Sequence, residues 1–287
     1  MIHEAITAAV ETILSEKIMR AEPVPGGDIN QVYRLKTNSG QYLIKINSAS
    51  RFPDMFIREA DGLAIIANTG AVNVPQAIAL GEAAGYSFLM MDWVEAGQSG
   101  NAGMAKLGEG LANLHRNTLV LFGFGEDNYI GSLHQSNRIH GEWSDFYREE
   151  RLQPLLKMAV DSGMLEPADT RQFERLYAKL PSLFEPEPPA LLHGDLWSGN
   201  FIIDKKNQPF LIDPAVYYGH REMDIAMTML FGGFGAAFYD AYQYHYPLAK
   251  GFEQRLKLWS LYPLLVHVNL FGGGYVQQLR SYLGTYL

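Results

Sequence analysis

The feature that most constrains this chain is a set of polar residues placed around short apolar segments between residues 190 and 213. Asp195 and Asn200 are five positions apart, and Asp213 directly follows the apolar residues 210–212. The turn-forming residues 205–208 lie between them and predict a short hairpin. A loop and a neighbouring hairpin can bring these oxygen-bearing side chains to one cleft, and Mg²⁺ prefers oxygen ligands. The sequence therefore predicts that three oxygen-bearing side chains, those of Asp195, Asn200 and Asp213, meet where a magnesium ion can bind.

The rest of the pattern divides the chain into a strand-rich front and a helical back. Residues 31–46 alternate in polarity on either side of a turn at 38–40, which is a strong hairpin signal. Further strands are expected at 77–83 and 86–92, and helices at 2–19, 53–68, 102–116, 143–163, 167–181 and from about 220 to the end. We therefore expect an α+β fold of two lobes, a small β-rich lobe at 1–95 and a larger helical lobe at 96–287.

The composition excludes several classes of protein. With 47% hydrophobic and 19% charged residues the chain is globular, and the absence of cysteine excludes disulfides, thiolate metal sites and a cysteine nucleophile. A net charge of −8 argues against nucleic acid as a partner. No apolar run approaches the roughly 18 residues of a membrane span, and the acidic, amphipathic N-terminus does not resemble a signal peptide. We expect a cytoplasmic protein that binds no membrane, with its oligomeric state left open.

The polar spacing at 195–213 matches the needs of phosphoryl transfer. That reaction needs bound phosphates, a bridging Mg²⁺, an oriented nucleophile and an acceptor for its proton. Protein kinases place a catalytic Asp and a metal-binding Asn five residues apart on one loop, and a second metal-binding Asp after the next hairpin. Taken singly, Asp195 and Asn200 would suit an ordinary Asx turn. Their joint spacing with Asp213 favours a kinase-like fold with Asp195 as the catalytic base and Asn200 and Asp213 as the magnesium ligands.

The front lobe offers residues that fit ATP. Lys45 lies in a predicted strand and Glu59 in the following predicted helix, which matches the kinase lysine that contacts phosphates and its helical partner. By itself, Lys45 would be a solvated strand charge. Gly26 and Gly27 can let backbone N–H groups approach phosphate oxygens, although the same pair suits a plain hairpin turn. No Walker A sequence occurs, so a P-loop fold is not expected.

Two segments, LLHGDLWSGNF and LIDPAVYYGHREMD, resemble the fructosamine kinase, or ketosamine-3-kinase, family. That family belongs to the aminoglycoside- and choline-kinase-like group of the protein-kinase-like fold. The resemblance extends from the loop at Gly26 to at least Asp224. It implies an ATP- and Mg²⁺-dependent transferase that phosphorylates the 3-hydroxyl of a ketosamine, such as a fructosamine or ribulosamine. The phosphorylated adduct is unstable and frees its amine, which implies a role in deglycation.

The resemblance also implies roles for residues outside the core motif. Backbone groups near Met91, Asp92 and Trp93 are expected to hold adenine. Trp197 is expected to contact the substrate, with packing between loop and helix as the alternative, and His220 and Glu222 are lesser candidates for the same pocket. His193 is expected to hold the catalytic loop, with a catalytic or zinc-binding role as the disfavoured alternative. Asp224, at a predicted helix start, is expected to brace that loop.

Three other functions remain open at this point. The acceptor can be choline, an aminoglycoside or a sugar, because only the helical-lobe pocket would differ. The chain can be a non-catalytic kinase-fold binding protein, although it retains the full set of expected catalytic residues. A protein-substrate kinase is disfavoured, because the segment between Asp213 and His220 is too short for a regulated activation loop. Whether the ketosamine is a free metabolite or a glycated amine on a protein is also open.

Overall fold

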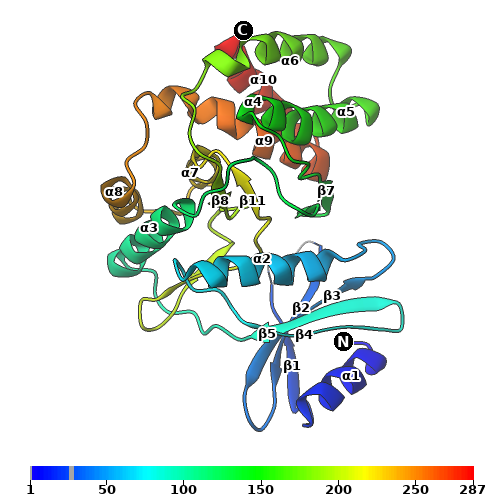
Figure 1. The fold of residues 1–287 in the computed structure, drawn as a ribbon. Coiled ribbons are helices and arrows are strands. Elements are labelled where there is room, and N and C mark those ends of the chain that lie inside the picture. Colours follow the sequence, from blue (N-terminus) through cyan, green and yellow to red (C-terminus); the bar gives the residue numbers. More distant parts are fainter. Residues whose placement is uncertain (1, 26–28) are drawn as a thin grey trace.

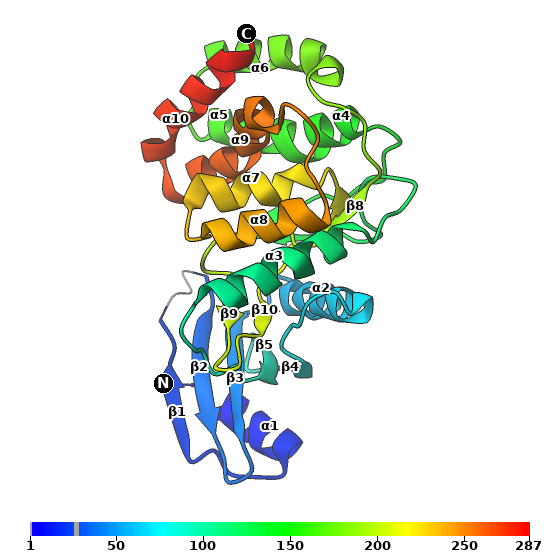
Figure 2. The same ribbon diagram turned by 90° about the vertical axis from the view of Figure 1, so that its left-hand side faces the viewer.

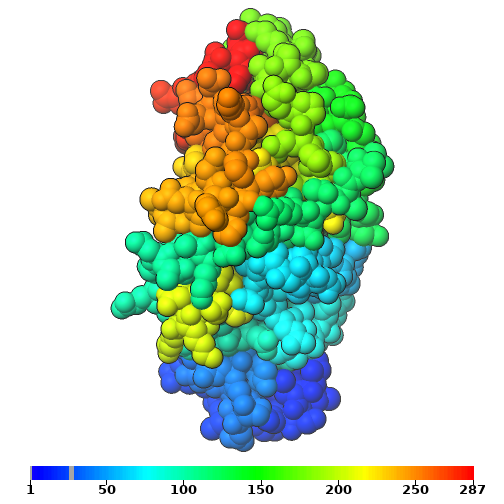
Figure 3. Space-filling view, turned by 60° about the vertical axis from the view of Figure 1, so that its left-hand side comes forward, coloured from blue at the N-terminus to red at the C-terminus, as the bar shows by residue number. Residues whose placement is uncertain are grey.

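The computed structural model describes residues 2–25 and 29–287 and shows two lobes stacked end to end (Figure 1). The predicted phosphate-contacting residues Gly26 and Gly27 lie outside the described residues. In the space-filling view the amino-terminal lobe forms the narrower end of an elongated molecule (Figure 3). No helix in the described part of the chain combines the length and apolar character needed to cross a lipid bilayer.

The amino-terminal lobe is built on a five-stranded antiparallel sheet with the order β1-β2-β3-β5-β4. Its strands are β1 (Arg20–Pro23), β2 (Gln31–Lys36), β3 (Gln41–Ser48), β4 (Ala77–Ala83) and β5 (Tyr86–Asp92). The hairpin predicted at 31–46 and the strand pair at 77–83 and 86–92 are confirmed. The predicted first helix is too long, because α1 (Glu4–Leu14) ends at a left-handed Ser15 and the following chain forms β1.

Two helices cover opposite faces of this sheet. Side chains alternate between the faces of a strand, so Ile44 and Ile46 of β3 pack with Ile6 and Val10 of α1. The opposite face of β3 carries Lys45 and lies on the side of α2 (Met55–Thr69). On that side, helix residues such as Phe56 pack against β5. In Figure 1, α2 lies between the sheet and the helical lobe. Strand alternation therefore turns Lys45 toward the helix that carries Glu59.

The carboxyl-terminal lobe consists mainly of helices. They are α3 (Asn101–His115), α4 (Trp143–Phe146), α5 (Gln153–Asp161), α6 (Pro167–Lys179), α7 (Glu222–Phe231), α8 (Ala236–His245), α9 (Phe252–Phe271) and α10 (Val276–Leu283). A π-helical segment, Tyr147–Leu152, joins α4 to α5, so the helix predicted at 143–163 is nearly continuous. Short 3-10 turns occupy Leu180–Ser182, Gly273–Tyr275 and Gly284–Tyr286.

Three two-stranded antiparallel ladders complete the carboxyl-terminal lobe. They are β6 (Asn128–Ile130) with β7 (Leu133–Gln135), β8 (Ala190–Leu192) with β11 (Tyr217–Gly219), and β9 (Phe201–Ile203) with β10 (Pro209–Leu211). The short strands predicted on either side of Asp195 and before Asp213 are thus confirmed.

The β9–β10 hairpin is held by chain segments from both sides. The Gly97 N–H donates to the Ile203 carbonyl at 2.8 Å, and the Leu211 N–H donates to the Asn73 carbonyl at 2.9 Å. Gly97 follows the sheet and Asn73 follows α2, so the hairpin is fixed relative to the amino-terminal lobe. Figure 2 shows β9 and β10 beside that lobe, below α3. We propose a lobe boundary at residues 95–96, between the end of β5 and the start of α3.

Helices α3 and α8 pack unusually closely because a glycine lies at their contact. A Cβ added to Gly108 would lie 2.2 Å from the backbone oxygen of Phe238 and 3.1 Å from the backbone nitrogen of Tyr242. Backbone atoms cannot rotate away as a side chain does, so a larger residue must push the helices apart. This contact fixes α8 against α3, and the two helices lie side by side in Figure 2.

We predict that Gly108→Val destabilises the protein by about 1–3 kcal/mol or more, as expected for an overpacked core. Urea unfolding measures the change. The matched control is Gly284→Val, because nothing lies within 4 Å of a Cβ added to Gly284. Equal unfolding midpoints for the two variants would contradict the close approach of α3 and α8.

Candidate active site

A buried cluster of one ammonium and two carboxylate groups joins the lobes. Lys45 of β3 lies 2.7 Å from a carboxylate oxygen of Glu59 on α2 and also contacts Asp213, which follows β10. The side chains of Lys45 and Glu59 are 6% and 11% exposed, whereas that of Asp213 is 43% exposed. Burial disfavours the charged ammonium, but the charges of Asp213 and Glu59 outweigh it and hold the pKa of Lys45 above its ordinary value. The structure therefore brings together three residues that the sequence analysis assigned to ATP and metal binding.

Asp195 and Asn200 contact each other across the loop that joins β8 to β9. The Asn200 side-chain amide donates to the backbone oxygen of Asp195 at 2.8 Å and to its carboxylate at 2.9 Å. The Ile212 N–H donates to the Asn200 carbonyl at 3.1 Å, which ties the loop to the residue before Asp213. Burial raises the pKa of Asp195 to about 7, the charge of Asp213 adds to this, and the hydrogen bond from Asn200 opposes it. An oriented carboxylate with a raised pKa is a typical general base.

Two residues next to the catalytic loop, Asp213 and Gly194, have positive φ angles, which side chains other than hydrogen disfavour. Asp213 has φ of 55°, which is uncommon for a residue other than glycine. Such strain is concentrated at functional sites. Gly194 has φ of 83°, and a Cβ there would lie 2.1 Å from the Ala215 backbone oxygen. Position 194 therefore accepts only glycine without displacing the segment that carries Asp213.

Asp224, in the first turn of α7, accepts hydrogen bonds from the catalytic loop. Its two carboxylate oxygens accept from the His193 N–H at 2.8 Å and the Gly194 N–H at 3.0 Å, and the His115 ring lies at 3.2 Å. Burial alone would raise the pKa of Asp224, but the His115 hydrogen bond and the neighbouring donors hold it below its ordinary value. Asp224 is therefore a buried carboxylate that fixes the backbone immediately before Asp195.

The His193 ring connects the loop to the segment that follows β10. Its Nε2 lies 2.9 Å from the Ile212 carbonyl, and its Nδ1 lies 3.3 Å from the Asp195 N–H. A carbonyl can only accept and a backbone N–H can only donate, so Nε2 carries the proton and Nδ1 is the acceptor. Burial lowers the pKa of His193, so the ring is neutral. Both ring nitrogens are occupied, which leaves none for proton transfer or for zinc.

Lys45, Asp195, Asn200 and Asp213 face a cavity of about 220 Å³ between the lobes. Its walls come from the segments before and within β2, from β3, α2, the β6 region, the catalytic loop and α9. The sequence-predicted residues among its lining are Lys45, Glu59, Asp195, Trp197, Asn200 and Asp213. Trp197 is 40% exposed, so it is a cavity residue and not a core anchor between loop and helix. Its contact with substrate stays a prediction.

The predicted adenine-binding segment lies where β5 leaves the sheet. Met91 is buried, and the Asp92 N–H already donates to the Gln76 carbonyl at 3.0 Å, so that N–H does not serve a nucleotide. The Trp93 backbone N–H has no hydrogen-bond partner among residues 2–25 and 29–287, whereas its indole N–H donates to Glu95 at 3.0 Å. The Trp93 ring stacks under Arg34 at 4.5 Å. The adenine contact of this segment stays a prediction, with Trp93 N–H as an available donor.

The expectation that His220 and Glu222 contact substrate is not supported. His220 is 1% exposed and stacks on Trp259 with ring centroids 5.0 Å apart. Glu222 is fully buried, accepts from Arg255 through both oxygens at 2.8 and 2.6 Å, and also accepts from the Trp259 indole at 2.7 Å. Neither residue lines the cavity. A buried carboxylate needs such partners. His220 and Glu222 therefore anchor the start of α7 to Arg255 and Trp259 of α9.

Comparison with known proteins decides the family. The family model described as "Fructosamine kinase" matches residues 1–287. The chain belongs to the fructosamine kinase family. A probable ketoamine kinase of Enterococcus faecium is 39% identical over 96% of this chain and 99% of its own length. A chloroplastic protein-ribulosamine 3-kinase of Arabidopsis thaliana is 40% identical over 96% of this chain and 86% of its own length.

Solved structures agree with this membership and with the kinase-like fold. A putative fructosamine-3-kinase from Thermobifida fusca is 33% identical, covers 98% of each chain and has a TM-score of 0.89. An aminoglycoside phosphotransferase in a ternary complex with ADP and hygromycin B covers 98% of each chain with a TM-score of 0.65, and at 13% identity it shares the fold alone. The two-lobed, protein-kinase-like α+β fold predicted from the sequence is confirmed, and this fructosamine kinase family member is a phosphotransferase.

The structure adds cavity residues that the sequence analysis did not select. Arg58, Tyr129 and Gly131 line the cavity, as do His267 and Phe271 of α9. They are far apart in sequence and belong to no local motif. The only sequence signal that could have found the α9 pair is their i, i+4 spacing, which places both side chains on one helix face.

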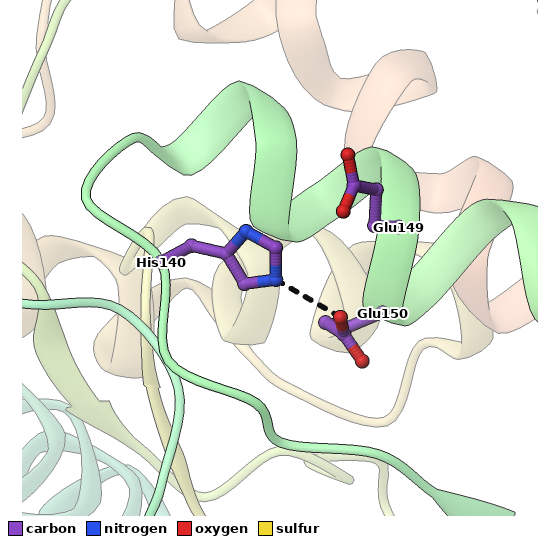
Figure 4. Close-up of side chains that lie close together, drawn as sticks. All are labelled: His140, Glu149 and Glu150. Atoms are coloured by element: carbon purple, nitrogen blue, oxygen red, sulfur yellow. Dashed lines mark hydrogen bonds and ion pairs between the residues drawn. The ribbon is translucent and has the colours of Figure 1, made fainter.

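A second cluster of potential metal-binding groups in this family member has a structural explanation. Figure 4 shows His140, Glu149 and Glu150 close together at the π-helical segment. The buried carboxylate of Glu150 accepts from His140 at 2.9 Å and from Arg138 at 3.0 Å. An arginine on the same oxygen opposes a cation there. We therefore assign these groups to an ion-pair network.

We predict that Asp224→Asn destabilises the protein by about 1–3 kcal/mol, because an amide nitrogen cannot accept the N–H that a carboxylate oxygen accepted. The turnover rate should fall as well, since the loop that carries Asp195 loses its support. Urea unfolding and steady-state kinetics measure both effects. The matched control is Asp240→Asn, an exposed residue of α8, which should change stability by less than about 0.5 kcal/mol. If the stability and turnover of the Asp224 variant match those of this control, the assignment of Asp224 as the residue that braces the loop is contradicted.

Proposed function

We propose that this protein transfers the γ-phosphoryl group of ATP to the 3-hydroxyl of a ketosamine, such as a fructosamine or ribulosamine. The observation that carries the proposal is the convergence of Lys45, Asp195, Asn200 and Asp213 on one cavity in a chain of the fructosamine kinase family. The name of the plant relative, a protein-ribulosamine 3-kinase, supports the acceptor class. Release of the amine from the unstable product would make the reaction a deglycation step in the cytoplasm.

The donor groups in the cleft suit a nucleotide and a magnesium ion. The Asn200 amide nitrogen is engaged with Asp195, which leaves the amide oxygen for a cation. Asp213 contacts Lys45 through one carboxylate oxygen and is partly exposed, so its other oxygen is available. These are the hard oxygen ligands that Mg²⁺ prefers. Asn200 and Asp213 would hold the ion, and Lys45 would hold phosphate oxygens.

A bound Mg²⁺ would supply charge neutralisation on the phosphate oxygens. The chain's own residues do the rest. Asp195 accepts a hydrogen bond from the substrate hydroxyl, which aims that oxygen along the line of attack. As the new oxygen–phosphorus bond forms, the bond from the γ-phosphorus to the ADP oxygen breaks, and the hydroxyl proton passes to Asp195. Lys45 stabilises the charge on the phosphates, and Glu59 keeps its ammonium in place.

The restraint of Asp195 at both its side chain and its backbone supports its assignment as the base. Asn200 restrains the carboxylate through a side-chain hydrogen bond, while the backbone on the other side is fixed through His193 and Asp224. A base held from two sides loses little freedom when substrate binds, which favours reaction. A non-catalytic kinase-fold protein has no need for a restrained carboxylate at this position.

The substrate assignment is tested by ADP release with Mg-ATP against a panel of acceptors. The panel contains the ribulosamine and fructosamine of lysine, choline, an aminoglycoside and free fructose. We expect turnover with a ketosamine and at most weak turnover with the others. Preferential turnover of choline, the aminoglycoside or fructose would keep the kinase mechanism and remove the ketosamine assignment.

We predict that Asp195→Asn lowers kcat by at least about 10²-fold, the lower end of what a general base contributes. ATP binding should survive, because Lys45, Asn200 and Asp213 remain. Calorimetry measures nucleotide affinity, and ADP release measures turnover. Asp240→Asn serves as the control with unchanged activity. Near-full activity of the Asp195 variant would contradict its role as the base.

A further inference from the structure

Helix α9 supplies one wall of the cavity, and only one of its side chains there is polar. The α9 residues that line the cavity are Val266, His267, Leu270 and Phe271, which share one face of the helix. Phe271 is 55% exposed although it is a large aromatic residue. An exposed aromatic side chain and a single polar ring on a cavity wall suit a bound ligand better than a packed core.

The His267 ring is held firmly by its neighbours. It stacks on Phe231 with ring centroids 4.4 Å apart and planes inclined by 28°. Tyr275 meets it edge-on at 4.9 Å, and Phe271 lies at 5.2 Å. Three aromatic contacts leave the ring little freedom to rotate, so its nitrogen atoms have fixed directions.

The hydrogen bond of one His267 nitrogen shows which of the two ring nitrogens carries the proton. His267 Nδ1 lies 2.8 Å from the Pro263 carbonyl, which can only accept, so Nδ1 carries the proton. Burial lowers the pKa of His267, which keeps the ring neutral. Its Nε2 therefore presents a lone pair, and this atom has no hydrogen-bond partner among residues 2–25 and 29–287. Nδ1 is turned to its own helix and His267 lines the cavity, so Nε2 is the ring nitrogen available to a ligand there.

The lone pair of a neutral imidazole binds hydrogen-bond donors and not acceptors. Phosphate oxygens of ATP are acceptors and offer nothing that Nε2 can bind. The donors of ATP belong to its nucleoside end, and the segment expected to hold adenine, residues 91–93, does not line this cavity. The hydroxyl and ammonium groups of a ketosamine are donors. The phosphates also have their own partners in Lys45 and the expected metal ligands. The acceptor substrate is thus the one whose chemistry matches the α9 wall.

We propose that His267 is a specificity-determining residue, whose Nε2 accepts a hydrogen bond from a hydroxyl or ammonium group of the acceptor substrate. Phe271 and Trp197, both exposed, provide aromatic surface for the carbon skeleton and a cationic amine. This inference rests on the proposed function for the identity of the acceptor. It adds the residue that distinguishes a donor-rich acceptor from other small molecules.

Two substitutions of His267 separate the contribution of the Nε2 lone pair to acceptor binding from that of the aromatic ring. His267→Phe keeps an aromatic ring against Phe231 and removes the lone pair. His267→Gln removes the ring and restores an acceptor oxygen at about the distance of Nε2. We expect the Phe variant to raise the acceptor KM about three- to tenfold, the loss of one hydrogen bond. The Gln variant should recover most of that loss.

The readouts exclude a merely structural effect. The KM for ATP and the melting temperature of the Phe variant should match the wild type. His245→Phe, on α8 and outside the cavity lining, is the matched control. An unchanged acceptor KM for His267→Phe would overturn the proposal, as would an equal rise in the KM for ATP or a failure of Gln to recover binding.

The two proposals fail in different ways. Wild-type turnover on the acceptor panel tests the proposed function. The ratio of variant to wild type tests His267 with whichever acceptor the wild type uses. Calorimetric binding of each panel acceptor, with a non-hydrolysable ATP analogue present, gives the same ratio without turnover. A ratio of one with an acceptor that binds would overturn the role of His267 even if the kinase activity stands.

Discussion

A single buried ammonium group, that of Lys45, joins three parts of the molecule on which the site depends. The strand that carries it belongs to the amino-terminal sheet, Glu59 comes from the helix above that sheet, and Asp213 follows the hairpin of the other lobe. A buried charge without partners is strongly unfavourable. The cluster therefore fixes how the lobes meet, and it leaves the exposed side of Asp213 directed to the cleft.

The support of the catalytic loop follows the same physical rule. Asp224 is buried but accepts from two backbone N–H groups and from His115, so its charge is retained. His193, whose backbone N–H is held by Asp224, contacts the Asp195 N–H and the Ile212 carbonyl through its ring and so restrains both segments. Asp195 itself has fewer donors, and its pKa is raised where that of Asp224 is lowered. The pKa values of these two carboxylates thus differ in direction because of their hydrogen bonds. The difference suits Asp195 to accept a proton and Asp224 to hold the loop.

Local sequence patterns predicted most of the elements that carry the site. The hairpin of β2 and β3 and the pair of β4 and β5 were predicted because side-chain alternation and turn residues are short-range signals. The first helix was predicted too long, since the chain after Leu14 has polar and apolar residues that suit either a helix or the pairing of β1 with β2. His220 and Glu222 were assigned to substrate because they stand in a family-like motif. Their burial depends on Arg255 and Trp259 of α9, which no nearby residue reveals.

By itself, the sequence determined the family, the two-lobe plan and the spacing of Asp195, Asn200 and Asp213, because these are properties of neighbouring residues and of their order along the chain. Only the tertiary structure decided which ionisable groups face the cleft and which are buried as pairs. It also decided that α9 forms a wall of the cavity with His267, which lies more than fifty residues after Asp213. The reason is that periodicity tells which face of a helix is apolar, but the partner of that face depends on long-range packing.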